Sequence, residues 1–319
     1  YFVGRTLSTL DGSYFVSRIA IAARMVSLLE AAAILYTFLS GPVVEPYQAL
    51  IIDPLTTGEG LARSAGTVGH PVVAAAVLIP GTIAWLEYAL SIPNGVQKWL
   101  AYLVLGASGI AILLTFSRGA WFALAITLLL FALRKGYFLQ WRSYIIGALV
   151  ALFIGVSPLG TYAQVRLAMT DLNDPSVTHR LLMYGWVGER WVSSVHWFLI
   201  GSGLGTAKIA MADSPPADGM EVIDNAWLTM LIEVGLIGTL LILSVQVVPS
   251  FLRVLRRGTP HTWIPLSILA LSIDGLTFDT FYWQQVAIVI WLLTGMLVTL
   301  NLAESMETVG FLKPSEASY

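Results

Sequence analysis

The stretch QKWLAYLVLGASGIAILLTFSRGAWFALAITLLLFALR (residues 97–134) consists of two apolar runs joined by a turn of three residues, Ser117-Arg118-Gly119. A helix that crosses the hydrocarbon core of a bilayer needs about 20 mainly apolar residues. Each run is close to that length, so the stretch predicts two membrane-spanning helices. The turn between them is so short that Arg118 is expected to lie at the membrane surface.

The composition of the whole chain has the same character. Of its 319 residues, 57% are hydrophobic and 11% are charged, and the mean hydropathy is +0.78. Soluble domains carry about 25% charged residues, so the composition indicates an integral membrane protein. The net charge of −2 gives no support for nucleic-acid binding. With no cysteine and only four scattered histidines, neither a metal site nor a cofactor is expected.

Eight windows of the chain predict an all-α, polytopic membrane protein. They cover about residues 18–40, 70–92, 97–116, 118–134, 142–159, 225–250, 263–281 and 283–302. Short loops rich in Lys and Arg lie on the cytoplasmic side of membranes. Lys98, Arg134 and Arg253 lie in or next to such loops, at every second connection, and this alternation sets the predicted orientation.

This topology predicts a single membrane domain in three parts. Residues 1–159 would hold the N-terminal membrane helices with external turns, residues 160–224 one long external loop, and residues 225–319 the C-terminal membrane helices. The chain begins with Tyr1 rather than Met, and we expect it to be N-terminally truncated.

Several basic residues fall on the predicted external side, where short loops usually lack them: Arg63, Arg118, Arg166, Arg180, Arg190 and Lys208. Guanidinium groups bind phosphate oxygens in a two-pronged way, and a diphosphate on a lipid carrier would lie at this depth. The alternative is that each arginine reaches the lipid head groups or pairs with a nearby carboxylate. For Arg118, held in the short turn, we favour the ligand.

The long external loop has a pattern of its own. Residues 178–200 carry apolar and aromatic positions at helical spacing, with Arg190 and His196 between them, as in a helix that lies flat on a membrane. The turn GSGLGTA (201–207) follows. No strand precedes it, so it does not indicate a dinucleotide-binding unit. Tryptophans of the outer side fit an aromatic belt: Trp186, Trp191, Trp197 and Trp283.

The stretch DNAWLTMLIEVGLIGT (224–239) opens the next span with a polar pair. Asp224 and Asn225 could cap the helix, because Asp and Asn accept hydrogen bonds from the unpaired N–H groups of a first turn. Gly235 and Gly238 have a spacing that suits close packing of helices. His70, just before Pro71 at the outer end of another span, could border a site.

Four stretches follow one another in a characteristic order. They are RSAGTVGHP (63–71), FSRGAWFALAITLLLFAL (116–133), RLLMYGWVGERWVSSVHWFLIGSGLGT (180–206) and the stretch 224–239. Together they resemble the bacterial O-antigen ligases and O-antigen polymerases, which are integral membrane glycosyltransferases. In the resemblance, the catalytic histidine of the family motif falls on Asp224.

The resemblance implies transfer of a glycan from an undecaprenyl-diphosphate donor to an acceptor sugar, on the non-cytoplasmic face of the bacterial inner membrane. It also implies an inverting, metal-independent reaction. Arg118 and Arg180 would bind the diphosphate, with Arg63 as a third candidate, and Asp224 would act as the base. Further candidate site residues are Arg190, His70, His196 and Asn225. Two alternatives stay open: a protein O-oligosaccharyltransferase, and a transporter or flippase of a lipid-linked saccharide.

Overall fold

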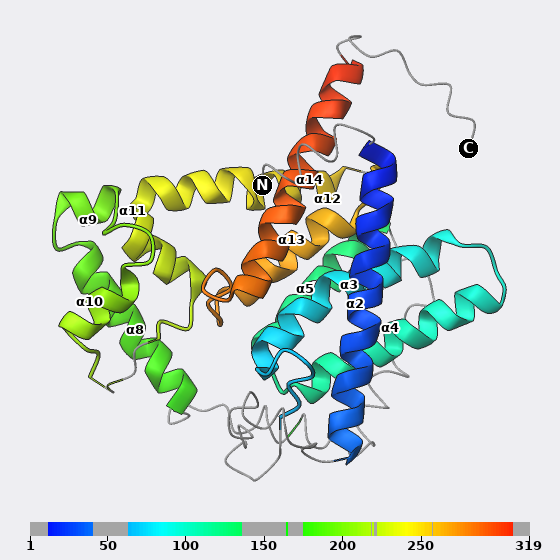
Figure 1. The fold of residues 1–319 in the computed structure, drawn as a ribbon. Coiled ribbons are helices and arrows are strands. Elements are labelled where there is room, and N and C mark those ends of the chain that lie inside the picture. Colours follow the sequence, from blue (N-terminus) through cyan, green and yellow to red (C-terminus); the bar gives the residue numbers. More distant parts are fainter. Residues whose placement is uncertain are drawn as a thin grey trace.

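The computed structural model describes residues 12–40, 63–135, 164, 175–217, 219, 222–256 and 258–308. These residues form helices and connecting turns, without a strand among them, so the all-α fold class is confirmed (Figure 1). The helices are α2 (Gly12–Ser40), α3 (Pro71–Ser91), α4 (Val96–Leu114), α5 (Arg118–Lys135), α8 (Pro175–Trp191), α9 (Val195–Leu199), α10 (Ala207–Asp213), α11 (Ala226–Val245), α12 (Val247–Leu255), α13 (Trp263–Asp274) and α14 (Gln284–Thr308).

Helical segments long and apolar enough to cross a membrane number five in the described part of the chain. They are Tyr14–Leu39, Pro71–Ser91, Val96–Leu114, Ala226–Leu255 and Gln284–Ser305. The predicted count of eight is therefore not confirmed. The window 142–159 lies outside the described residues, and the predicted span 263–281 is too long, because α13 ends at Asp274.

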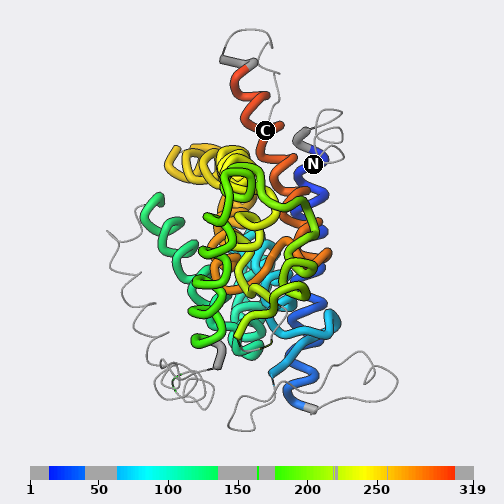
Figure 2. Tube along the Cα trace, turned by 90° about the vertical axis from the view of Figure 1, so that its left-hand side faces the viewer, coloured from blue at the N-terminus to red at the C-terminus, as the bar shows by residue number. Residues whose placement is uncertain are grey.

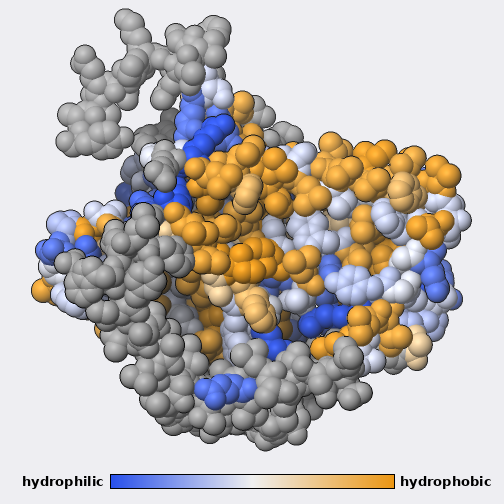
Figure 3. Space-filling view, turned by 180° about the vertical axis from the view of Figure 1, so that it is seen from behind, coloured by the Kyte–Doolittle hydropathy of each residue, from blue (hydrophilic) through white to orange (hydrophobic). Residues whose placement is uncertain are grey.

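The outer surface fits a bilayer. Large apolar side chains such as Leu29, Trp99 and Leu103 are about 70% exposed, which would be costly in water and is favourable against lipid. Figure 3 shows hydrophobic residues over much of one face, with hydrophilic residues gathered in a hollow between them. The chain is a multi-pass membrane protein.

Helix α3 lies at the centre and packs against α2, α4 and α13. The contact with α2 depends on Gly81, where a Cβ would lie 2.3 Å from the carbonyl oxygen of Ala23. Ser27 of α2 and Ser108 of α4 share a hydrogen bond of 3.1 Å. Close packing at small residues and hydrogen bonds between hydroxyl groups hold membrane helices together, because in lipid no hydrophobic effect drives apolar side chains to associate.

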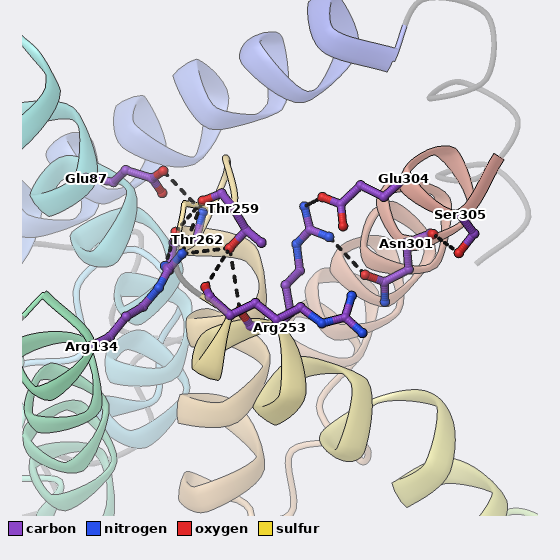
Figure 4. A network of polar contacts seen from close by, with 9 residues as sticks. Glu87, Arg134, Arg253, Thr259, Thr262, Asn301, Glu304 and Ser305 are labelled. Atoms are coloured by element: carbon purple, nitrogen blue, oxygen red, sulfur yellow. Dashed lines mark hydrogen bonds and ion pairs between the residues drawn. The ribbon is translucent and has the colours of Figure 1, made fainter. Parts of the chain in front are cut away.

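A polar network joins five helices at one end of the bundle (Figure 4). Glu87 of α3 accepts hydrogen bonds from the N–H groups of Thr262 and Trp263, at 3.1 and 2.6 Å, and so caps α13. The other contacts come from two arginines. Arg134 of α5 donates to Thr259 and Thr262 before α13, and Arg253 of α12 donates to Asn301 and Glu304 of α14. We call this the network end.

The first residue of α2 and the last turn of α14 also lie at the network end, where α14 extends beyond the other helices (Figures 1 and 2). The helices alternate in direction. His70 before α3, Arg118 at the start of α5 and Gln284 at the start of α14 therefore lie at the opposite end, which we call the cavity end.

Helices α8, α9 and α10 lie on the side of α11 that faces away from α2 and α4 (Figures 1 and 2). Met183 and Val187 of α8 form a second small core with Met211 of α10 and Ile232 of α11. The prediction of one helix over residues 178–200 is wrong in its extent. The helix ends at Trp191, and its buried side chains pack on protein.

Helix α11 is broken at Gly235, which has a φ of 64°. The break frees backbone carbonyls, and these need partners in a membrane-length helix. The turn after α9 supplies them: Ser202 N donates to Ile232 O and Gly203 N donates to Glu233 O, both at 2.8 Å. Gly235 was expected to serve packing alone. It is also the point where the helix direction changes.

Candidate functional site

A cavity of about 680 Å³ lies at the cavity end of the bundle. Its walls come from the segment before α3, the start of α5, the start of α8, the segment before α11 and the α13–α14 connection. The lining includes five residues selected from the sequence: Arg63, His70, Arg118, Arg180 and Asp224. Residues more than 150 positions apart in the chain therefore meet around one space.

Arg63 is held against the end of α4. Its Nε donates to Thr115 O at 3.0 Å, and the next residue, Ser64, donates its N–H to Leu114 O at 3.2 Å. Both acceptors are carbonyls at the C-terminus of a helix, where no N–H of the same helix can reach them. Arg63 is thereby fixed beside the turn that carries Arg118.

Arg118 is the first residue of α5, so the cavity receives a guanidinium group together with the positive end of a helix dipole. The turn before it depends on Phe116, which has a φ of 52°. Gly119 lets the turn approach the α13–α14 connection, because a Cβ there would lie 1.8 Å from Thr277 Oγ1. The start of α5 is thus pressed against Thr277.

Arg180 of α8 reaches the same connection, since its Nη2 donates to Thr277 O at 3.1 Å. Its neighbour His179 is 4% exposed, and the His179 Nε2 lies 2.8 Å from Val222 O. Because a carbonyl oxygen can only accept, Nε2 carries the hydrogen. His179 thereby ties the segment before Asp224 to α8. Sequence reasoning did not select it, although its position next to Arg180 was a signal.

Asn225 and Asp224 have different roles although they are adjacent. Asn225 caps α11: its Oδ1 accepts from the N–H groups of Trp227 and Leu228 at 3.0 and 3.1 Å, and its Nδ2 donates to Leu276 O at 2.8 Å. It is buried and does not line the cavity. Asp224 does line it.

Backbone conformation also singles out this cavity. In the described segments, three non-glycine residues have positive φ, namely Phe116, Asp224 and His261, and the first two line the cavity. Such conformations cost on the order of 1 kcal/mol and cluster at functional sites. Asp224, with a φ of 49°, is therefore held in its position by the surrounding structure.

His70 lies stacked on Trp283, with ring centroids 5.0 Å apart, and both line the cavity. Burial and the charge of Arg63 lower the pKa of His70, and the carboxylate of Asp224 opposes this shift. The imidazole is therefore neutral at neutral pH. Its buried Nδ1 has no hydrogen-bond partner among the described residues. Trp283, expected in an aromatic belt, belongs to the cavity wall.

Two other candidates lie away from the cavity. Arg190 donates to Ser214 O at 3.1 Å, and its guanidinium lies 3.9 Å from the ring centre of Trp186. It thus joins α8 to the segment after α10. His196 lies exposed in the short helix α9. Within the described ranges, no group of three or more His, Asp or Glu residues could hold a metal ion.

Comparison with known proteins gives one match. A family described as O-antigen ligase matches residues 101–243, which include Arg118, Arg180 and Asp224 and amount to somewhat under half of the chain. No curated protein and no solved structure matches the chain. The match supports a membrane glycosyltransferase of the ligase or polymerase type, which would act on a lipid-linked glycan. The resemblance to the O-antigen ligase and polymerase family, stated from short motifs, is thus confirmed over residues 101–243.

Proposed function

We propose that the protein transfers a glycan from an undecaprenyl-diphosphate carrier to an acceptor sugar, at the cavity end of the bundle, on the external face of the bacterial inner membrane. The observation that carries this proposal is the lining of one cavity by Arg63, Arg118, Arg180 and Asp224. Cations and a carboxylate that meet in one space, at the end of membrane helices, suit a charged head group on a lipid.

The three arginines come from three separate elements, and the start of α5 adds the positive end of its helix dipole. A diphosphate that leaves the anomeric carbon takes the bonding electron pair and gains negative charge. Fixed guanidinium groups stabilise that charge as it develops, without the reorganisation that water would need. Arg118 and Arg180 would make the main contacts, and Arg63 would support them.

Asp224 would accept the proton of the acceptor hydroxyl as its oxygen attacks the anomeric carbon. One C–O bond forms, the bond to the diphosphate breaks, and the configuration inverts. His70 lines the same cavity, and its lowered pKa leaves the imidazole neutral near pH 7.

The test uses the purified full chain with a polyprenyl-diphosphate glycan and follows release of the carrier diphosphate. Asp224→Asn keeps the size of the side chain and removes the base, so the rate should fall about 10²- to 10⁴-fold. Binding of the donor should change little, since the arginines remain. Asp224→Glu is the matched control and should retain part of the rate.

Full activity of Asp224→Asn would exclude Asp224 as the base. Donor binding by the unaltered chain without any turnover, in the presence of a range of acceptor sugars, would instead favour the transporter.

A further inference from the structure

A second cavity, of about 630 Å³, lies between α11 and α14. Most of its lining is apolar: Leu204, Met230, Val234, Leu241, Ile242, Phe281 and Trp291. Tyr282 lines both this space, which we call the α11–α14 groove, and the cavity with the arginines. The walls of the two spaces therefore meet at one side chain.

The groove runs along both halves of α11. It begins at Leu204 and Gly205 in the glycine-rich turn, passes Thr229 in the first half of the helix, and reaches Ile242 beyond the break at Gly235. Both α11 and α14 belong to segments long and apolar enough to cross a membrane. The groove therefore runs along the membrane-spanning part of the protein, and its wall meets that of the charged cavity at Tyr282.

The polar side chains of the groove are engaged by the protein itself. Thr229 Oγ1 donates to Asp279 Oδ2 at 2.7 Å, and Glu233, which is 8% exposed, accepts the N–H of Ala207 at 3.2 Å. A sugar in this space would lose hydrogen bonds to water without regaining them. A hydrocarbon chain has no such requirement, and each buried methylene contributes about 0.8 kcal/mol.

We propose that the α11–α14 groove binds the isoprene units next to the diphosphate of the donor lipid. This inference rests on the proposed function, because it gives a binding site to the hydrocarbon tail of the same lipid whose head group the arginines would bind. A space of this size matches ordinary ligand pockets and holds only part of a long prenyl chain. The remainder of the chain would lie in the bilayer.

The test measures binding of three soluble probes to the full chain in lipid nanodiscs: dimethylallyl, geranyl and farnesyl diphosphate. They share the head group and lengthen by one isoprene unit each. If the groove binds the tail, the affinity should rise along the series, with farnesyl diphosphate bound at least about tenfold more tightly than dimethylallyl diphosphate.

Two neighbouring leucines give a matched pair of variants. Leu241 lines the groove and is 61% exposed, whereas Leu240 does not line it and is 53% exposed. Leu241→Trp should lower the affinity for farnesyl diphosphate about tenfold and leave that for dimethylallyl diphosphate within about twofold. Leu240→Trp adds the same bulk and partitions into the same nanodisc, and should change neither. Ile242→Trp is a second groove variant, in case the first does not fold.

An equal gain in affinity with chain length in Leu241→Trp, Ile242→Trp and the unaltered chain would overturn the inference. It would mean that the groove holds a bilayer lipid or nothing, while the proposed function would stand. A failure of the proposed function is distinguishable, because then no diphosphate, dimethylallyl diphosphate included, would bind to the unaltered chain.

Discussion

The two ends of the bundle use arginine in opposite ways. At the network end, Arg253 is 2% exposed and its guanidinium lies against Asn301 and Glu304, inside the protein. At the cavity end, Arg118 and Arg180 are partly exposed and line a space of about 680 Å³. The comparison shows that the role of an arginine in a membrane protein depends on whether its guanidinium lies against protein acceptors or beside a cavity.

The difference has a physical reason. A guanidinium removed from water is costly unless acceptors replace its hydration, so Arg253 is useful where α12 and α14 must be held in one arrangement. An arginine beside a cavity keeps part of its hydration and can exchange it for phosphate oxygens at little cost. The same substitution should therefore impair stability at one end and activity at the other.

Of the substitutions that compare the two ends, Arg118→Ala is expected to have the largest effect. Removing a fixed donor from a developing negative charge lowers transfer about 10²- to 10³-fold, which corresponds to about 3–4 kcal/mol. Thermal unfolding should be nearly unchanged, because the side chain lines a cavity. Arg190→Ala is the matched control, since Arg190 lies on Trp186 outside the cavity. Equal losses of transfer in both variants would mean that the cavity is not the site.

A somewhat smaller effect, of the opposite kind, is expected for Arg253→Met. Breaking a buried pair by removing one partner costs about 3 kcal/mol, at the low end of the usual range because the Glu304 side chain is 35% exposed. Denaturation in detergent should show this loss, while the folded fraction keeps its rate of transfer. Lower transfer at full stability would contradict the division between the two ends.

The smallest effect is expected for Asn225→Ala, which removes the cap of α11 and costs about 1 kcal/mol of stability. Asn225→Asp keeps an acceptor for the N–H groups of Trp227 and Leu228 but loses the donor to Leu276 O, and should recover only part of that loss. This pair separates capping from catalysis at two adjacent positions. If Asn225→Ala abolished transfer in a fully folded protein, the distinction between Asn225 and Asp224 would fail.

The membrane helices could be predicted where apolar runs decide the structure. The windows 70–92, 97–116 and 118–134 correspond to α3, α4 and α5, whose ends lie within two residues of those limits. The window 225–250 hides the break at Gly235, because the break depends on hydrogen bonds from Ser202 and Gly203, more than 20 positions earlier. No local pattern contains that information.

The residues of the candidate site could likewise be predicted only where the local sequence determines their position. Arg118 could be predicted because a turn of three residues between two apolar runs must lie at the membrane surface. The structure places Arg118 in the lining of the cavity. His179 does not stand out in the sequence, because it acts through the carbonyl of Val222. Trp283 is assigned to an aromatic belt from the sequence, because its contact with the ring of His70 is not visible there. Contacts between distant parts of the chain determine such roles, and the spacing of residues in the sequence does not reveal these contacts.

The interlock of Gly201 with Gly235 has a consequence for biosynthesis. A Cβ at Gly201 would lie 2.5 Å from Glu233 O, and one at Gly235 would lie 2.5 Å from Ile200 N. The turn that binds the free carbonyls of α11 precedes this helix in the chain, so the turn emerges from the ribosome before α11 does. The free backbone carbonyls of the bent helix therefore do not depend on a partner segment that is synthesised later.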